Sequence, residues 1–209
     1  MTFKLLRFSH LPIQKQLHLE ENLLRHEKGN YIVLNTETPP AIVLGISNKE
    51  HDLVHLDALP SHIPLVRRFS GGGTVIVDEE TVFVTFICNK TDFAFAPYPE
   101  PILRFAAAQL KLSLPDLELK ENDFVVGDKK CGGNALYIKK DRWLIHTSFL
   151  WSYAPDRMAL LKHPAKAPSY RGDRSHVDFL CPVSSLLPCK RGWMDLMAET
   201  LIDRSSFNI

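Results

Sequence analysis

Apolar residues recur along the chain at helical spacing in three segments. Residues 12–26 carry apolar side chains on one face of a helix that we expect to begin at a proline. Residues 99–112 repeat the pattern more strongly, and residues 192–202 predict a terminal helix. The sequence therefore predicts three substantial helices separated by long stretches of other structure.

The stretches between them contain short apolar or alternating runs that predict strands. Few helices separate these runs, and several are joined by short turns, so the strict β-α-β rhythm of a parallel sheet is absent. We therefore predict an α/β (α+β) fold with a mixed, largely antiparallel sheet flanked by helices. Asn48 is expected to cap a short helix. The predicted strands are residues 5–8, 31–35, 41–45, 63–66, 74–77, 82–88, 124–126, 134–138 and 143–150.

Composition and charge narrow the class of protein. The chain has 209 residues, of which 45% are hydrophobic, so it fits one large domain or two small ones with a real core. A net charge of +1 argues against broad nucleic-acid binding, which needs a basic excess. No apolar run approaches the roughly 20 residues of a membrane span, and the N-terminus lacks a signal-peptide pattern. We therefore expect a cytoplasmic protein with no membrane partner.

The four cysteines, Cys88, Cys131, Cys181 and Cys189, show neither a C-x-x-C pair nor zinc spacing. We expect free thiols and no metal site built from cysteine and histidine. Cys131 is a candidate nucleophile because it follows Lys130. No histidine base or orienting carboxylate lies near it in sequence, which disfavours that role.

The most informative motif is RRFSGGGTV at residues 67–75. Consecutive glycines let backbone amides approach a ligand closely, and the guanidinium of Arg68 suits a phosphate or carboxylate. The motif is not a Walker P-loop, because no Lys-Ser or Lys-Thr follows, and a strand rather than a dinucleotide-binding helix comes next. It predicts a cradle for an anionic small molecule between two strands of a hairpin. The alternative is a glycine-rich hairpin with solvated arginines.

A second motif, GDKKCGGNA, occupies residues 127–135. Lys130 stands between a predicted turn and two glycines that allow close backbone approach. Its ammonium could hold a carboxylate next to a phosphate and stabilise the charge that develops during acyl transfer. The alternative is a surface turn with solvated lysines.

A third group of candidates lies on the predicted strand at residues 143–150. Alternation places His146 and Ser148 on one face and Thr147 on the other. His146 is either a substrate contact or a hydrogen-bonded structural histidine, and the sequence favours the second reading.

Together these motifs resemble the lipoate–protein ligase A family, within the biotin/lipoate ligase superfamily. Residues 67–75 match its Arg-Arg-x-Ser/Thr-Gly-Gly-Gly-x-Val pattern. The Asn122-Asp123 pair and residues 127–135 match its Asn-Asp and Gly-Asp/Arg-Lys-x-x-Gly-Asn/Ser-Ala patterns, and His146 begins its His-x-Thr/Ser-Leu-like strand. The N-terminal helix with Glu20-Glu21 and the Val43-Leu44-Gly45-x-x-Asn48 segment also resemble the family. The resemblance covers roughly residues 5–190, and it implies a single lipoate–protein ligase-like catalytic domain over residues 1–209.

The resemblance implies a fold like the catalytic domain of class II aminoacyl-tRNA synthetases and a reaction in two halves. Lipoate and ATP, with Mg²⁺, give lipoyl-AMP and pyrophosphate. The lipoyl group then passes to a lysine of lipoyl-domain acceptors, namely E2 subunits and the glycine cleavage H protein. The resemblance implies that Lys130 is the catalytic residue, in contact with the lipoyl carbonyl and the phosphate, and that Arg68 contacts the nucleotide. The other implied binding residues are Ser70, Gly71, Gly72, Gly73, Thr74, Val75, Ile76, Asp123, Gly133, Asn134, Ala135 and His146.

Two features depart from the family pattern. Val77-Asp78 stands where the family has His-Asp, and little follows Trp193 beyond one helix, whereas longer ligases add a C-terminal accessory domain. The short chain leads us to expect a separate accessory protein, or transfer of preformed lipoyl-AMP.

Other members of the superfamily give rival interpretations. Cysteine-dependent octanoyl- or lipoyl-transferases carry a nucleophilic cysteine shortly before the lysine motif, and residues 115–126 contain none. Biotin ligases have a different arginine-glycine loop. A non-catalytic lipoyl-binding or docking module is the alternative from another class.

The basic, proline-rich segment 162–174 is predicted to be a loop that docks an acidic lipoyl domain or folds over the adenylate. Its basic residues are Lys162, Lys166, Arg171 and Arg174.

Overall fold

A computed structural model describes residues 2–163 and 167–202 of the chain. Seven of the described strands form one sheet, in which the first pair is parallel and all other pairs are antiparallel. This confirms the predicted mixed, largely antiparallel sheet. In spatial order the strands are β1 (Phe3–Ser9), β2 (Asn30–Thr36), β6 (Thr81–Asn89), β10 (Arg142–Leu150), β9 (Lys129–Ile138), β8 (Asp123–Val126) and β7 (Glu118–Lys120).

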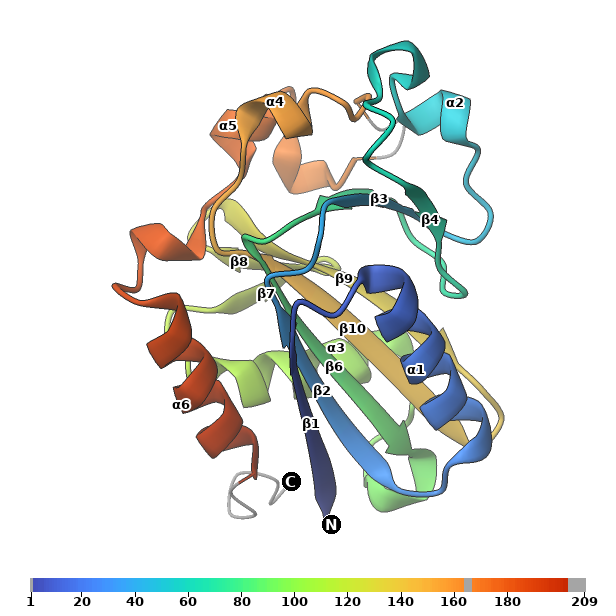
Figure 1. The fold of residues 1–209 in the computed structure, drawn as a ribbon. Helices are drawn as coiled ribbons and strands as arrows, with labels where there is room; N and C mark the ends of the chain where they lie inside the picture. The colour runs from blue at the N-terminus through green and yellow to red at the C-terminus, as the bar shows by residue number, and fades with distance from the viewer. Residues whose placement is uncertain (1, 164–166, 203–209) are drawn as a thin grey trace.

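A smaller sheet of three strands lies over one end of the large one (Figure 1). It consists of β4 (Leu65–Arg67), β3 (Ala41–Leu44) and β5 (Thr74–Val77), in that order. The predicted hairpin between residues 63–66 and 74–77 is therefore wrong, because β3 lies between the two strands, parallel to β4 and antiparallel to β5. The glycine-rich segment connects the two outer strands of this sheet and passes beyond the end of β3.

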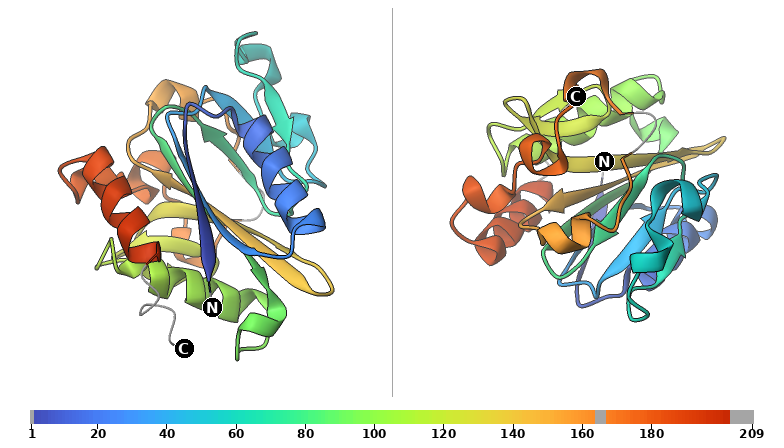
Figure 2. Two further views of the ribbon diagram at one scale, coloured as in Figure 1. Left: turned by 60° about the horizontal axis from the view of Figure 1, so that its bottom comes forward. Right: turned by 90° about the horizontal axis from the view of Figure 1, so that it is seen from above.

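The long helices cover opposite faces of the large sheet (Figures 1 and 2). Helix α1 (Ile13–His26) packs on one face, and α3 (Pro99–Lys111) and α6 (Lys190–Ile202) pack on the other. These are the three helices that the apolar spacing predicts. Among the described helices, none is both long and apolar enough to cross a membrane. The short helices are α2 (Glu50–Leu53), α4 (Pro155–Met158) and α5 (His176–Phe179), and 3-10 turns occur at Leu56–Ala58, Lys90–Asp92, Ser169–Arg171 and Val183–Ser185.

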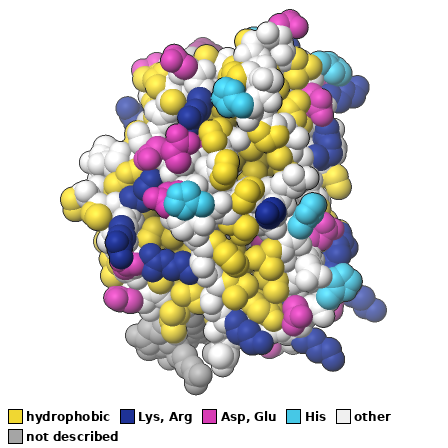
Figure 3. All heavy atoms as spheres, viewed as in Figure 1, with side chains coloured by type: hydrophobic (Ala, Val, Ile, Leu, Met, Phe, Trp, Pro, Cys, Tyr) yellow, Lys and Arg dark blue, Asp and Glu magenta, His cyan; other side chains and the backbone are white. Residues whose placement is uncertain are grey.

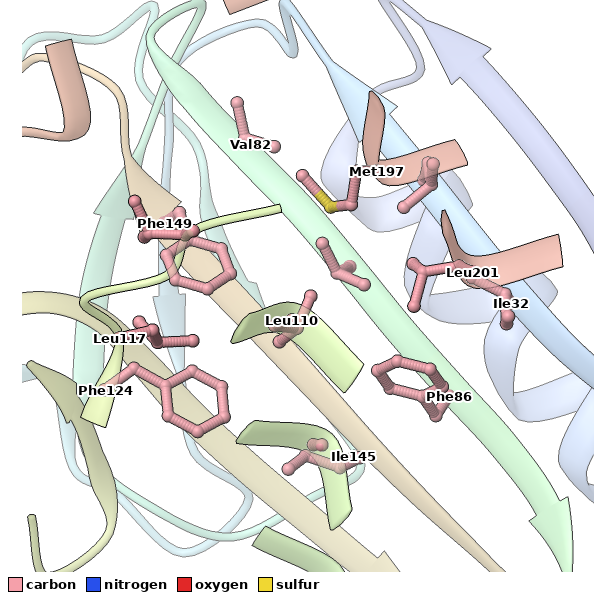
Figure 4. Close-up of a cluster of buried hydrophobic side chains, with 14 of the residues drawn as sticks. Ile32, Val82, Phe86, Leu110, Leu117, Phe124, Ile145, Phe149, Met197 and Leu201 are labelled. Carbon is pink, nitrogen blue, oxygen red and sulfur yellow. The ribbon is translucent and has the colours of Figure 1, made fainter. Parts of the chain in front are cut away.

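The main hydrophobic core fills the space between the large sheet and the α3–α6 layer. Phe86, Leu110, Phe124, Phe149 and Leu201 meet there (Figure 4). Each fully buried side chain of this kind stabilises the fold by roughly 1.5–3 kcal/mol. The packing fixes β9 and β10, whose other face carries candidate site residues.

The surface is mixed in charge on the face seen in Figure 3. Acidic and basic side chains are interspersed around its margin, and hydrophobic side chains reach the surface between them (Figure 3). This face presents no extended field of one sign.

Two local predictions differ from the structure. Asn48 does not cap α2, because Lys49 precedes the helix and no side chain caps it. The side-chain Nδ2 of Asn48 donates instead to the carbonyl oxygen of Gly72 at 2.9 Å. Strand β9 begins at Lys129, so most of the 127–135 motif is strand and not turn. The sequence did not predict a strand over the paired glycines, because glycine is depleted in strands.

Candidate functional site

A cavity of about 700 Å³ opens between the small sheet, β9, β10 and the segment that follows α4. The glycine-rich bend and Lys130 both line it, although 62 residues separate Arg68 from Lys130 in sequence. Ser70 is the exception among the expected site residues, since it is buried behind the cavity and does not line it. The expected residues that line the cavity are Arg68, Gly71, Gly72, Gly73, Thr74, Val75, Ile76, Asp123, Lys130, Gly133, Asn134, Ala135 and His146.

Arg68 holds the glycine-rich bend together from inside. The residue is only 6% exposed, and its Nη2 donates to the carbonyl oxygens of Gly71 at 2.8 Å and Gly73 at 2.9 Å. Burial lowers the pKa of Arg68 to about 10, so the guanidinium stays charged at neutral pH. It thus places a fixed positive charge directly beneath the bend.

The glycines of the bend meet different requirements. Gly72 has φ of 99°, and a Cβ there would lie 2.8 Å from Nη2 of Arg68, so only glycine fits. A Cβ on Gly71 or Gly73 would meet no atom within 4 Å, so side chains there would occupy open space at the cavity. Gly45, just after β3, is also required, because its Cβ would stand 2.2 Å from the carbonyl oxygen of Gly72.

The outer side of the bend is held by Arg67, the first arginine of the motif, and by Asn48, which the sequence assigned to a helix cap. Arg67 donates from Nη1 to the carbonyl oxygen of Asn48 at 2.6 Å and to that of Gly45 at 3.2 Å. Asn48 in turn donates to Gly72. The two arginines of the motif therefore have separate tasks, one inside the bend and one outside it.

A hydrogen-bonded chain connects the bend to α1. Ser70 Oγ lies 3.0 Å from Nε2 of His146, and Nδ1 of His146 lies 3.0 Å from Oε2 of the fully buried Glu20. Glu20 also accepts from Gln16 at 2.8 Å and from Thr85 at 2.6 Å. The order serine, histidine, carboxylate is that of a hydrolytic triad, but the buried Ser70 has no access to the cavity and cannot act as a nucleophile.

His146 thus combines the two roles that the sequence left open. It is hydrogen-bonded on both ring nitrogens, as a structural histidine is, and it also lines the cavity. The sequence did not identify Glu20 as its partner, because the two residues lie 126 positions apart.

On the other side of the cavity, Lys130 is paired with Asp123. Lys130 Nζ lies 2.8 Å from Oδ1 of Asp123, and the Tyr170 hydroxyl donates to Oδ2 at 3.0 Å. Burial, then the charge of Asp123, raises the pKa of Tyr170, which remains a donor. The Lys130 side chain is 24% exposed and passes over Gly133. A Cβ added to Gly133 would lie 3.4 Å from Nζ of Lys130.

The side chain of Asn134, on β9, is held in place by hydrogen bonds to Asn122 and Thr147. Its Nδ2 donates to the carbonyl oxygen of Asn122 at 3.0 Å, and its Oδ1 accepts from Thr147 at 2.6 Å. Both polar groups of the side chain are therefore satisfied within the protein.

Cys131 points away from the cavity, into the core. It is fully buried, and its Sγ contacts the carbonyl oxygen of Phe124 at 3.4 Å. Burial raises the pKa of Cys131 to about 12, so the thiol stays protonated at neutral pH. Neighbouring residues on a strand face opposite sides, which explains why Lys130 lines the cavity and Cys131 does not.

The segment after α4 closes the charged side of the cavity. Arg171 is 4% exposed and lines the cavity, so it is not available for surface docking. Arg174 pairs with Asp128 at 2.9 Å. Lys162 donates to the carbonyl oxygen of His51 at 2.7 Å, and Lys166 lies outside the described residues.

A backbone bridge ties this segment to β9. The amide of Cys181 donates to the carbonyl oxygen of Lys130 at 2.8 Å, and Leu180 forms a parallel bridge with Lys130. The chain that carries Arg171 and His176 is therefore joined to the strand that carries the catalytic candidate.

The described residues give the cavity no cluster of metal ligands. Among the described residues no group of three or more histidine, cysteine or acidic side chains could hold a metal ion. Of the carboxylates that line the cavity, Asp123 is bound to Lys130 and Tyr170, and Glu121 accepts from Ser169. Magnesium is commonly held by one or two carboxylates plus substrate phosphates, and neither carboxylate is free for it.

Comparison with known sequences identifies relatives over much of the chain. The Lipoyl protein ligase A/B catalytic domain matches residues 12–202. "Inactive lipoate--protein ligase 2" of Plasmodium falciparum is 27% identical over 195 residues, covering 75% of this chain and 50% of its own length. "Probable lipoate-protein ligase A" of Mycoplasma genitalium is 31% identical over 141 residues, covering 64% of this chain and 41% of its own length. The chain thus spans about half the length of these relatives or less.

Solved structures share the fold. Lipoate-protein ligase A bound with ATP aligns with a TM-score of 0.75 at 18% identity, over 96% of this chain and 85% of its own. A Thermoplasma acidophilum protein with bound lipoic acid gives 0.76 at 18%, over 96% and 86%. The bi-partite ligase of that organism, studied with its E2 lipoyl domain, gives 0.78 at 20%, over 96% and 84%. With the family match over residues 12–202, the chain belongs to the lipoyl protein ligase A/B catalytic domain family.

Proposed function

We propose that this protein is a lipoate–protein ligase, which forms lipoyl-AMP from lipoate and ATP and transfers the lipoyl group to a lysine of a lipoyl-domain acceptor such as an E2 subunit or the H protein. The observation that carries the proposal is the shared cavity, lined by the glycine-rich bend on one side and by Lys130 on the other. A fold neighbour with ATP and another with lipoic acid support the two substrates.

In the first half-reaction, a lipoate carboxylate oxygen attacks the α-phosphorus of ATP. An acyl–oxygen–phosphorus link forms, the bond to the β-phosphate breaks, and pyrophosphate leaves. Two anions must approach each other, so fixed cations lower the barrier. Lys130, at the cavity, and Arg68, beneath the bend, supply these charges. No step is assigned to a protein-bound magnesium ion.

In the second half-reaction, the ε-amine of the acceptor attacks the acyl carbon. An amide forms, AMP leaves, and the amine loses a proton. For this step Lys130 Nζ exchanges its contact with Asp123 for the acyl oxygen and phosphate, while Tyr170 continues to hold the carboxylate. The amides of the bend, at positions without side chains, offer further donors to the adenylate.

The decisive experiment measures pyrophosphate release by this chain alone, supplied with lipoate and Mg²⁺-ATP, followed by lipoylation of a purified lipoyl domain. Lipoate-dependent release and a lipoylated product are expected. Product only from synthetic lipoyl-AMP would replace the proposal with a transferase. Product from an octanoyl carrier without ATP would replace it with an acyltransferase.

A second candidate is a non-catalytic lipoyl-binding module, because the Plasmodium relative is named an inactive ligase. Tight binding of lipoate or of the lipoyl domain with no covalent product in any of these assays would favour the module.

A further inference from the structure

Arg171 is a buried charge for which the described residues provide no counter-charge. It ends the 3-10 turn Ser169–Arg171 and is 4% exposed. Its Nε donates to the carbonyl oxygen of Arg174 at 3.1 Å, and its guanidinium lies over the Phe179 ring, 5.0 Å from the centroid. Within residues 2–163 and 167–202, its buried Nη2 has no hydrogen-bond partner and no carboxylate forms an ion pair with it. A buried donor left unpaired is costly, so the arrangement suggests a missing ligand group.

The surroundings of Arg171 favour an anion. Arg171, His176 and Lys130 all line the cavity, and Phe179 and Leu180 add an apolar surface beside them. Burial, followed by the charges of Arg171, His163 and Lys130, lowers the pKa of His176, and the rings of His163 and His176 lie 6.5 Å apart. Asp123 offsets only part of this charge, since it is already paired with Lys130.

We propose that Arg171, together with His176 and Lys130, forms a phosphate-binding subsite of the cavity, in which Nη2 of Arg171 donates to a phosphate oxygen. The planar guanidinium suits phosphate geometry, and a group with more than one negative charge matches several clustered bases better than a single carboxylate does. This inference rests on the proposed function for the source of the phosphate, which is either the nucleotide's α-phosphate or the departing pyrophosphate.

Titration calorimetry with inorganic pyrophosphate and with AMP tests the subsite. The variants are Arg171→Met and the control Lys129→Gln, which removes an exposed positive charge that does not line the cavity. Loss of one charge-assisted hydrogen bond predicts binding weaker by about 10- to 100-fold for Arg171→Met. The control is expected to change affinity by less than about threefold.

The two probes distinguish the sources of the phosphate. If Arg171→Met binds pyrophosphate more weakly than the wild type, Arg171 contacts the leaving group. If the variant binds only AMP more weakly, Arg171 contacts the adenylate. Unchanged affinity for both, in a folded Arg171→Met protein, would overturn the subsite. An Arg171→Lys variant keeps the positive charge but loses the planar pair of guanidinium donors. It is expected to bind the affected probe about tenfold more weakly than the wild type, and it replaces Arg171→Met in the test if the methionine variant does not fold.

Thermal unfolding without ligand separates binding from a structural role. Removal of an unpaired buried charge is expected to leave the Tm of Arg171→Met equal to or above that of the wild type. A fall in Tm with unchanged affinities would make Arg171 structural. These measurements need neither lipoate nor acceptor, so a failure of the proposed ligase activity leaves the subsite standing, and a failure of the subsite leaves the activity standing.

Discussion

The two sides of the cavity satisfy their polar groups in opposite ways. The glycine side, residues 68–73, is stabilised by its own hydrogen bonds: Arg68 binds the bend's carbonyls, and Ser70 is joined to His146 and Glu20. Only at its end does a buried polar atom, the Thr74 hydroxyl, lack a partner among the described residues. On the charged side, formed by Lys130, Arg171 and His176, the described residues supply one carboxylate partner, and one guanidinium nitrogen of Arg171 has no partner among them.

The difference teaches which side is preorganised and which side depends on a ligand. A bend stabilised by internal hydrogen bonds keeps its shape without substrate, and preorganised donors cost no reorganisation during a reaction. The charged side gathers basic groups that the described residues pair only in part, and the proposed anion would complete them. We therefore expect mutations on the glycine side to lower stability and mutations on the charged side to lower binding or rate.

Lys130→Ala is expected to have the largest effect on activity. Loss of a donor that acts on developing charge predicts a fall of about 10²–10³-fold in the rate of lipoyl transfer, with the fold intact. Lys129→Ala is the matched control, because Lys129 is exposed and does not line the cavity. Single-turnover assays with circular dichroism check this, and normal turnover in Lys130→Ala would remove its catalytic assignment.

Arg68→Met tests the glycine side. The substitution leaves the carbonyls of Gly71 and Gly73 without their donor, so we expect a loss of about 2–3 kcal/mol in the free energy of unfolding, together with weaker ATP binding. Arg67→Met, on the exposed side of the bend, is expected to cost about 1 kcal/mol or less. Urea unfolding measures both. Equal costs for the two arginines would contradict the division between inside and outside.

His176 tests the charged side through pH. Its pKa is lower in the folded protein than the ordinary value of 6.5, so the unfolded chain binds the proton more tightly. Stability should therefore fall as pH drops below about 6.5 and recover above it. Urea unfolding between pH 5 and pH 8 is expected to show a flatter profile for His176→Gln. An unchanged profile would show that the neighbouring charges do not affect this histidine.

Cys131→Ala is expected to have the smallest effect on activity. The protonated core thiol faces away from the cavity, so transfer should stay within about twofold of the wild-type rate, despite a modest loss of stability. The comparison with Lys130→Ala, one residue away, tests the two faces of β9 directly. Loss of transfer together with a trapped acyl-thioester on Cys131 would restore the cysteine mechanism.

The sequence predicted where the helices and strands lie along the chain better than it predicted which strands pair with each other. Hydrophobic spacing located α1, α3 and α6, because each helix buries one continuous face. It assigned β4 and β5 to a hairpin, because apolar runs mark strands without stating which strand lies beside them. The intervening β3 comes from a distant part of the chain, and only tertiary packing brings it there.

For the candidate site, the motifs identified residues that share the cavity but not what holds them. Glu20 and Asn48 lie in segments that match the family pattern, but the sequence did not indicate their partners, His146 and Gly72, which lie elsewhere in the chain. Arg171 belongs to a basic, proline-rich stretch of a kind that is normally solvated. Its burial depends on Phe179, which closes over it only in the folded chain.

The backbone bond from Cys181 to Lys130 has a consequence for energetic coupling. Because it joins two segments 51 positions apart, a shift of either one displaces the ammonium and the guanidinium together. Substitutions at Lys130 and Arg171 should consequently be non-additive in a double-mutant cycle, even though no contact between their side chains is required. Sequence changes near Leu180 would then alter the spacing of the two cations, and with it the size of the anion that fits between them.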